Sequence, residues 1–179
     1  MASKFKIYWD SCLFFEWLGG EVVDRSLQDG LNEILDQNDA KENIILTSVI
    51  ADLEVIPEKL EAKKAGSVDQ YNQLFDGVSF VSIEINKNIL SMAREIRDFY
   101  YKHPDEGGKG GKVLDLGDAI HLATAIIYEC DEFQTRDGAS KGSKVPIFGI
   151  YEYSGYDKIC NKYELKISSP IADQRSMDV

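Results

Sequence analysis

Short β-prone segments alternate with amphipathic helical segments along most of this chain. Phe5–Trp9 and Asn43–Thr47 are β-prone runs, and the second is apolar without alternation, as in a strand that is buried on both faces. Between them, Asp24 is a candidate N-cap for a helix whose apolar residues recur every three or four positions. Strands that alternate with helices favour parallel pairing. We therefore predict an α/β fold, a three-layer α/β/α sandwich with a mostly parallel central sheet.

The remaining elements continue this alternation. Three further strands are predicted, at Val78–Ile83, Phe133–Thr135 and Val145–Ile150. Helices are predicted after Ser48 with an interruption at Pro57, after the candidate cap Asn86, and, most clearly, over Asp115–Cys130. The chain is 179 residues long, which favours one domain. We assign residues 1–152 to it and expect residues 153–179 to be a C-terminal extension that packs on it or trails from it.

The cysteine pattern and the N-terminal sequence indicate the cellular compartment of the protein. The three cysteines are far apart and form neither a zinc motif nor an even disulfide set. The N-terminus has no apolar stretch followed by a small-residue cleavage site, and no window approaches the ~20 apolar residues of a membrane span. We therefore expect a cytoplasmic protein with reduced thiols and no membrane partner.

The chain is acidic, with 31 Asp and Glu residues against 20 Lys and Arg residues and a net charge of −11. Proteins that coat nucleic acid electrostatically present basic surfaces. The charge therefore excludes sequence-blind coating of nucleic acid, but it does not exclude local contact with a nucleic-acid substrate.

Four acidic residues from distant parts of the chain are expected near one edge of the predicted sheet. Asp10 follows the first strand, Glu54 lies in the helix after the second, Asp118 lies in the first turn of the long helix, and Asp137 follows the Phe133–Thr135 strand. In open α/β sheets, sites lie at the carboxyl ends of the strands. Two like charges about 4 Å apart cost around 4 kcal/mol at an effective dielectric of 20, so such a group must take up protons or bind a cation.

Oxygen-rich ligands with few His or Cys residues favour Mg²⁺ or Mn²⁺ over Zn²⁺. Such ions can activate water and stabilise the oxygens of a phosphodiester during hydrolysis. The alternative is that the acids are helix caps or solvated residues. Asp115 is interpreted as the N-cap of its helix, with a place at the site as the other possibility. His121 is interpreted as a hydrogen-bonded structural histidine, with a place facing the metal site as its alternative.

Four short motifs carry a resemblance to a known family. They are Trp9-Asp10-Ser11, Thr47-Ser48 followed after five residues by Glu54, Gly117-Asp118-Ala119-Ile120 continuing to Ala125, and Thr135-Arg136-Asp137. In order and spacing, this set resembles the PIN-domain family over residues 5–150. The resemblance implies a Rossmann-like sandwich, a PIN-like nuclease domain over residues 1–152, and an Mg²⁺- or Mn²⁺-dependent ribonuclease that is often the toxin of a toxin–antitoxin pair.

The resemblance also implies roles for single residues. Asp10, Glu54 and Asp118 fall on the three principal metal-binding acids of the family, and Asp137 falls on its fourth, more variable acid. Ser11 and Thr135 fall on hydroxyl positions that support the site and lie beside the substrate. The resemblance further implies a homodimer and an antitoxin that places a basic side chain in the acidic pocket. Arg136 departs from the family pattern, in which Asn is commoner between the Thr and the Asp.

A basic group is expected beside the acids. Its members come from the glycine-rich loop before the long helix and from the segment around Asp137: Lys109, Lys112, Arg136, Lys141 and Lys144. They could form a positive rim that holds RNA phosphates, or the lysines could serve only solubility.

The sequence therefore predicts a metal-dependent endoribonuclease that acts on RNA. One alternative is a catalytically inactive PIN-like module that binds RNA or serves as a scaffold. A second is a metal-dependent phosphatase or other phosphotransferase, which is disfavoured because Asp10-Ser11-Cys12, and no Asp-x-Asp motif, follows the first strand.

Overall fold

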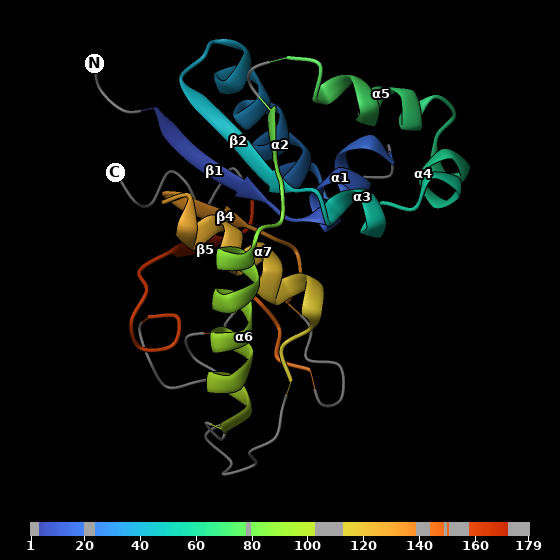
Figure 1. Cartoon of the computed structure of the whole chain (residues 1–179). Coiled ribbons are helices and arrows are strands. Elements are labelled where there is room, and N and C mark those ends of the chain that lie inside the picture. The colour runs from blue at the N-terminus through green and yellow to red at the C-terminus, as the bar shows by residue number, and fades with distance from the viewer. Residues whose placement is uncertain are drawn as a thin grey trace.

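The computed structural model describes residues 4–19, 24–77, 80–102, 113–138, 144–148, 150 and 158–171. Within these residues, strands and helices alternate along the chain as the sequence predicts (Figure 1). In chain order the elements are β1 (Phe5–Trp9), α1 (Ser11–Leu18), α2 (Arg25–Asp39), β2 (Asn43–Ser48), α3 (Ala51–Glu54), α4 (Pro57–Lys63), α5 (Ser67–Leu74), β3 (Phe80–Ile83), α6 (Lys87–Lys102), α7 (Leu116–Ile127), β4 (Glu132–Gln134) and β5 (Lys166–Ser168).

The five described strands form one sheet in the order β3-β2-β1-β4-β5, and every pair in it is parallel. β1 is central, with Ile7 paired to Ile45 of β2 on one side and to Glu132 of β4 on the other. Chain order runs outward from β1 to β3 and then restarts beside β1 at β4. The strand order therefore reverses between β1 and β4, where open α/β sheets form their binding crevices.

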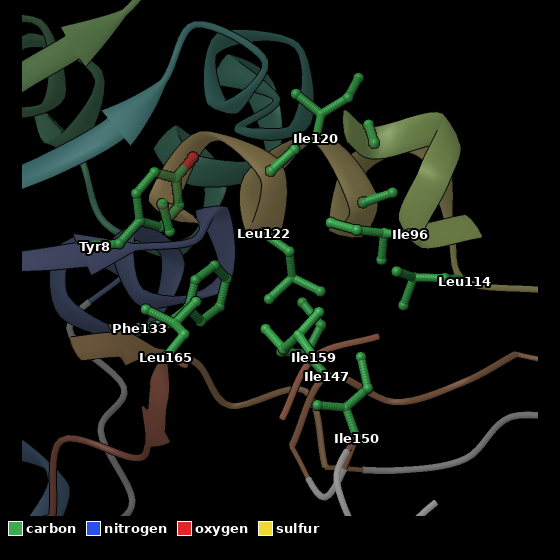
Figure 2. Packing of buried hydrophobic residues seen from close by; sticks show 14 of the residues in the cluster. Tyr8, Ile96, Leu114, Ile120, Leu122, Phe133, Ile147, Ile150, Ile159 and Leu165 are labelled. Atoms are coloured by element: carbon green, nitrogen blue, oxygen red, sulfur yellow. The ribbon is translucent and has the colours of Figure 1, made fainter. Parts of the chain in front are cut away.

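Apolar side chains cover both faces of the sheet. Successive residues of β1 point to opposite faces, so Ile7 and Trp9 belong to one core cluster while Tyr8 belongs to the other. The first cluster is covered by residues of α1, α2, α4 and α5, and the second by α6 and α7. Figure 2 shows the second cluster, in which Leu122 and Phe133 approach one another between α7 and β4. Helices on both faces of a parallel sheet make a three-layer α/β/α sandwich, and the predicted fold class is confirmed.

Several predicted helix boundaries are confirmed by their capping contacts. The Asp24 carboxylate accepts a hydrogen bond from the Ser26 backbone N–H at 3.0 Å at the start of α2. The Asn86 side chain accepts bonds from the first N–H groups of α6. Pro57 is the first residue of α4, a position where a missing N–H is not needed. It therefore divides the helical stretch after Ser48 into α3 and α4.

The predicted strand at Val145–Ile150 is wrong. The described residues of this segment form no strand or bridge, and only the preceding residue, Lys144, makes an isolated bridge, with Val113. Their N–H groups bond elsewhere: Ile147 N donates to the Asp137 carboxylate at 3.3 Å, and Phe148 N donates to the Asp137 carbonyl at 2.9 Å. Pro146 has no N–H to give a ladder, and the segment turns back onto the loop after β4 instead.

The fifth strand lies instead at Lys166–Ser168, within the range assigned to a C-terminal extension. β5 pairs with β4 through Glu132–Lys166, Phe133–Ile167 and Gln134–Ser168. The described part of this range is thus a component of the sheet itself. Among the described residues, none of the helices is both long and apolar enough to cross a membrane.

Candidate metal centre

Asp10 lies at the carboxyl end of β1 and is 5% exposed. It is the N-cap of α1, because its Oδ1 accepts the Cys12 N–H at 3.1 Å. The Cys12 Sγ lies 2.7 Å from the same oxygen, and the Thr135 hydroxyl donates to Oδ2. Burial raises the pKa of Asp10, and the hydrogen bonds from Cys12 and Thr135 oppose that rise. Asp10 is thus a buried carboxylate that is fixed in place at the end of β1.

Thr135 connects the ends of β1 and β4. Its hydroxyl donates to Asp10 and accepts the Asp137 N–H at 2.9 Å. A second link joins the same two loops, because the Arg136 N–H donates to Cys12 Sγ at 3.1 Å. The loop that carries Asp137 is therefore held against the end of β1 by side-chain and backbone contacts.

Glu54 is the last residue of the four-residue helix α3 and reaches across to α7. Its Oε2 lies 2.9 Å from Nε2 of His121, and it also hydrogen-bonds the Ser11 side chain. Burial alone would raise the pKa of Glu54, but the hydrogen bond with the His121 ring and the electrostatic attraction to that ring outweigh the burial and lower the pKa. Glu54 is therefore an ionised carboxylate at neutral pH.

Asp118 and Asp115 come from the start of α7, where the helix dipole favours negative charge. Burial raises the pKa of Asp118 to about 7, and the carboxylates of Asp137, Asp115 and Asp10 add to the rise. Asp115 caps α7 by accepting the Gly117 N–H at 3.2 Å, and it also pairs with Lys144. That pair lowers the pKa of Asp115. The preferred interpretation of Asp115 as an N-cap is confirmed, and its carboxylate also borders the site.

These side chains face one pocket of 440 Å³ at the carboxyl ends of the strands. Its polar lining consists of Ser11, Glu54, Asp115, Asp118, Asp137 and Lys144. Asp10 does not line the pocket, but its charge raises the pKa of Asp118. The site is a concentration of carboxylates with a single lysine at its edge among the described lining residues.

The donor set is that of a hard cation, because carboxylates and a hydroxyl supply oxygen ligands. Within the described residues, no three Asp, Glu, His or Cys side chains are positioned to bind one ion together. The carboxylates form an open arrangement around the pocket. It fits Mg²⁺ held by one or two carboxylates and retained waters, which is how proteins commonly bind this ion. It does not fit a closed cage of protein ligands.

The structure brings together six of the residues that the sequence singled out. They are Asp10, Ser11, Glu54, Asp118, Thr135 and Asp137. Arg136 lies in the same loop as Asp137 with an exposed side chain, and Lys144 lies at the pocket edge, paired with Asp115. Lys109, Lys112 and Lys141 lie outside the described residues.

Sequence reasoning did not assign Cys12 or Gly117 to the site, and it gave His121 a mainly structural role. His121 is hydrogen-bonded and only 1% exposed, as that interpretation requires, yet its second ring nitrogen faces Glu54. The available signal was helical spacing. Gly117 and His121 are four residues apart and Asp118 lies between them, so all three are near one side of the first turns of α7.

Comparison of the sequence with protein-family models and with curated proteins found no match. Comparison with solved structures found a similar chain in a toxin–antitoxin complex from Klebsiella pneumoniae. The two chains are 23% identical, the likeness covers 78% of the present chain and 95% of the other, and the TM-score is 0.45. A similarity of this size says nothing about the activity of the present chain.

Proposed function

We propose that this protein is a metal-dependent endoribonuclease that hydrolyses RNA phosphodiester bonds. One observation carries the proposal: carboxylates from α3, the start of α7 and the loop after β4 line a single pocket, and Asp10 at the end of β1 is hydrogen-bonded beside it, where strand order reverses. Burial raises the pKa of Asp118 to about 7, and repulsion from the neighbouring carboxylates adds to the rise. Such a group of acids becomes stable at neutral pH when a cation is bound.

Each acid has a distinct place in this proposal. Glu54, Asp118 and Asp137 line the pocket, and one or two of these carboxylates would bind Mg²⁺ or Mn²⁺ directly while retained waters complete its coordination. Asp10 lies behind the pocket lining and supports the site through its hydrogen bond with Thr135. A bound ion of this kind supplies an activated water and stabilises the charge that develops on the phosphodiester oxygens. Thr135 holds Asp10 and the Asp137 loop together through its hydroxyl, and Ser11 orients Glu54 through a hydrogen bond.

The substrate assignment to RNA follows from the resemblance of the motifs to the PIN-domain family. Lys144 lines the pocket, and Arg136 lies on the loop of Asp137 with an exposed side chain that lines a neighbouring hollow. Lys109, Lys112 and Lys141 extend this positive rim in the proposal. Local positive charge of this kind is compatible with the overall charge of −11, because the backbone phosphates are contacted only beside the site.

The same resemblance extends the proposal to a toxin of a toxin–antitoxin pair, acting as a homodimer. An antitoxin would inhibit by placing a basic side chain among the carboxylates. The open acidic pocket, with Lys144 already paired at its edge, is the kind of surface that accepts such a side chain.

The test is cleavage of total RNA by purified protein with Mg²⁺, Mn²⁺ or EDTA. We expect cleavage with either metal and none with EDTA. The double variant Asp10→Asn, Asp118→Asn should lose at least about 100-fold in rate, because two oxygen donors lose their charge. The matched control is Asp29→Asn, which removes an exposed acid of α2 far from the pocket. Full activity in the double variant would overturn the site assignment.

A second candidate function is favoured by a specific observation. Asp10 and Asp115 both cap helices, and no three described ligand side chains are positioned to bind one ion together. These features fit a catalytically inactive module that binds RNA or serves as a scaffold. Thermal unfolding with increasing Mn²⁺ separates the two: a nuclease site gives a rising melting temperature that Asp118→Asn abolishes, whereas an inactive module gives no shift.

A further inference from the structure

Glu54 receives little support from its own helix. It ends a helix of four residues that has no side-chain cap, and the side chain must extend away from that helix to reach the pocket. A glutamate has three side-chain torsions and loses considerable rotamer freedom when fixed. The contacts that fix its carboxylate must therefore come from elsewhere in the fold.

A buried chain of hydrogen bonds reaches the Glu54 carboxylate from the core. Its Oε2 lies 2.9 Å from Nε2 of His121, and Nδ1 of that ring lies 2.7 Å from the Tyr8 hydroxyl. His121 is 1% exposed and Tyr8 is fully buried. An ionised carboxylate can only accept, so Nε2 must carry a proton. With the proton on Nε2, Nδ1 accepts the Tyr8 O–H, and each ring nitrogen has one role.

Gly117 leaves the space that the carboxylate occupies. A Cβ at this position would lie 2.0 Å from Glu54 Oε1 and 3.2 Å from its Cδ. Any side chain at residue 117 would thus displace the carboxylate. Gly117 lies one helical turn before His121 on α7, so the same face of the helix makes room for Glu54 and donates a hydrogen bond to it.

We propose that Tyr8, His121 and Gly117 form a clamp that fixes the Glu54 carboxylate in the pocket, with His121 and Gly117 as positioning residues for the site. The inference rests on the proposed function, since it concerns an acid assigned to the metal. Partners that hydrogen-bond a metal-binding side chain commonly change metal affinity 10- to 100-fold when they are removed. The clamp is a property of the metal-free fold and is testable without metal.

The first test is the ¹⁵N spectrum of the imidazole rings in metal-free protein. The chain has two histidines, so the variant His103→Asn assigns the His121 signals. We expect His121 to be a single tautomer protonated on Nε2, with a signal that moves in Glu54→Ala and in Gly117→Ala. The clamp would be overturned by a proton on Nδ1 alone, or by His121 signals that stay unchanged in both variants.

The second test is Mn²⁺ affinity, measured as the loss of the free-ion electron paramagnetic resonance signal. The Gln amide nitrogen is as many bonds from Cβ as Nε2 of histidine, whereas the Asn amide nitrogen matches Nδ1. We therefore expect His121→Gln to bind Mn²⁺ almost as wild type and His121→Asn to bind about 10- to 100-fold more weakly. Gly117→Ala should resemble His121→Asn. In a Glu54→Ala background, neither substitution should weaken binding further.

The two tests separate the clamp from the proposed function. If wild-type protein binds no Mn²⁺, the metal-dependent function fails and the imidazole spectrum alone decides the clamp. If wild type binds Mn²⁺ and His121→Asn binds it equally well, the clamp fails while the function stands. If His121→Asn weakens binding and His121→Gln does so equally, the side chain serves only packing and the clamp is overturned.

Discussion

The hydroxyl of Thr135, just after β4, donates a hydrogen bond to the carboxylate of Asp10, just after β1. Both residues are buried, and the two strands are neighbours at the reversal of strand order. The same hydroxyl oxygen accepts the Asp137 N–H. One small side chain therefore serves two acids of the site, as donor to one and as acceptor for the backbone of the other.

Replacing Thr135 by valine keeps its shape and removes both contacts. The buried carboxylate of Asp10 loses a donor and the Asp137 N–H loses its acceptor, so we expect the free energy of unfolding to fall by about 1–3 kcal/mol. Urea denaturation measures the loss. Thr135→Ser retains the hydroxyl and is the control; a Thr135→Ser variant as unstable as Thr135→Val would show that the methyl group, and not the hydroxyl, matters.

Asp118 should destabilise the metal-free protein at neutral pH. Its pKa is raised from 3.8 to about 7, so the folded state holds a proton that the unfolded state has lost between these values. Stability contributed by this group therefore falls as pH rises from about 4 to about 7. We expect Asp118→Asn to be about 1–3 kcal/mol more stable than wild type at pH 8 in EDTA, a value reduced for the partial exposure of the group.

That difference should shrink as the pH falls and vanish below about pH 3, where Asp118 is protonated in both states. Urea titrations at several pH values measure it, with Asp29→Asn as the exposed control. A destabilised Asp118→Asn at pH 8 would contradict the raised pKa. The same titration should appear in metal binding: Mn²⁺ competes with the proton, so its affinity should rise with pH through about 7.

We expect the Cys12 thiol to react slowly with alkylating reagents, although it is partly exposed to solvent. Burial raises its pKa well above the usual value, and the neighbouring Asp10 charge adds to the rise. Only the thiolate reacts, so we expect slow alkylation by iodoacetamide at pH 8. Asp10→Asn should accelerate modification of the Cys12 peptide, as followed by mass spectrometry. The buried Cys130 is the internal reference, because its reaction rate should not change.

We expect Lys144 to weaken the binding of metal and to strengthen the binding of RNA. It pairs with Asp115 at the pocket edge, so Lys144→Ala leaves the acids with one cation fewer. We expect Mn²⁺ affinity to rise several-fold and RNA affinity to fall, with a shallower dependence on salt. Calorimetry and a salt-titrated RNA-binding assay measure the two. The control is Lys102→Ala, which removes an exposed lysine of α6 that pairs with Asp98. Parallel changes in both affinities would contradict the assigned place of Lys144.

The fold class was predictable because the strand and helix patterns agree with the caps between them. Asp24, Asn86 and Asp115 each begin a helix where a polar side chain precedes an apolar periodic run. The shared location of Asp10 and Asp137 was likewise predictable once parallel pairing was expected, because parallel strands present their carboxyl ends at one edge. Glu54 and Asp118 lie on the helices α3 and α7, and the motif resemblance also pointed to them.

The last strand and the support of Glu54 were not predictable in this way. Val145 and Ile147 are buried by packing on the loop after β4, and an apolar run gives the same sequence pattern in that position as in a strand. Lys166–Ser168 is three residues long and contains one apolar residue, Ile167, so no sequence pattern marks it as a strand and its position depends on the ladder with β4. The space over Gly117 is a relation between α3 and α7, which no local pattern encodes.

The place of β5 has a consequence for how the protein is made. β5 is the last strand of the described chain, yet it borders β4, and the carbonyl of Ser168 accepts the Thr135 N–H at 3.0 Å. A ribosome delivers residues in order at about 5–20 per second, and early segments fold first. Thr135, which contacts both Asp10 and Asp137, therefore lacks its hydrogen bond with β5 until residue 168 has left the ribosome. We expect the centre of a nascent chain to stay without order until residue 168 has left the ribosome.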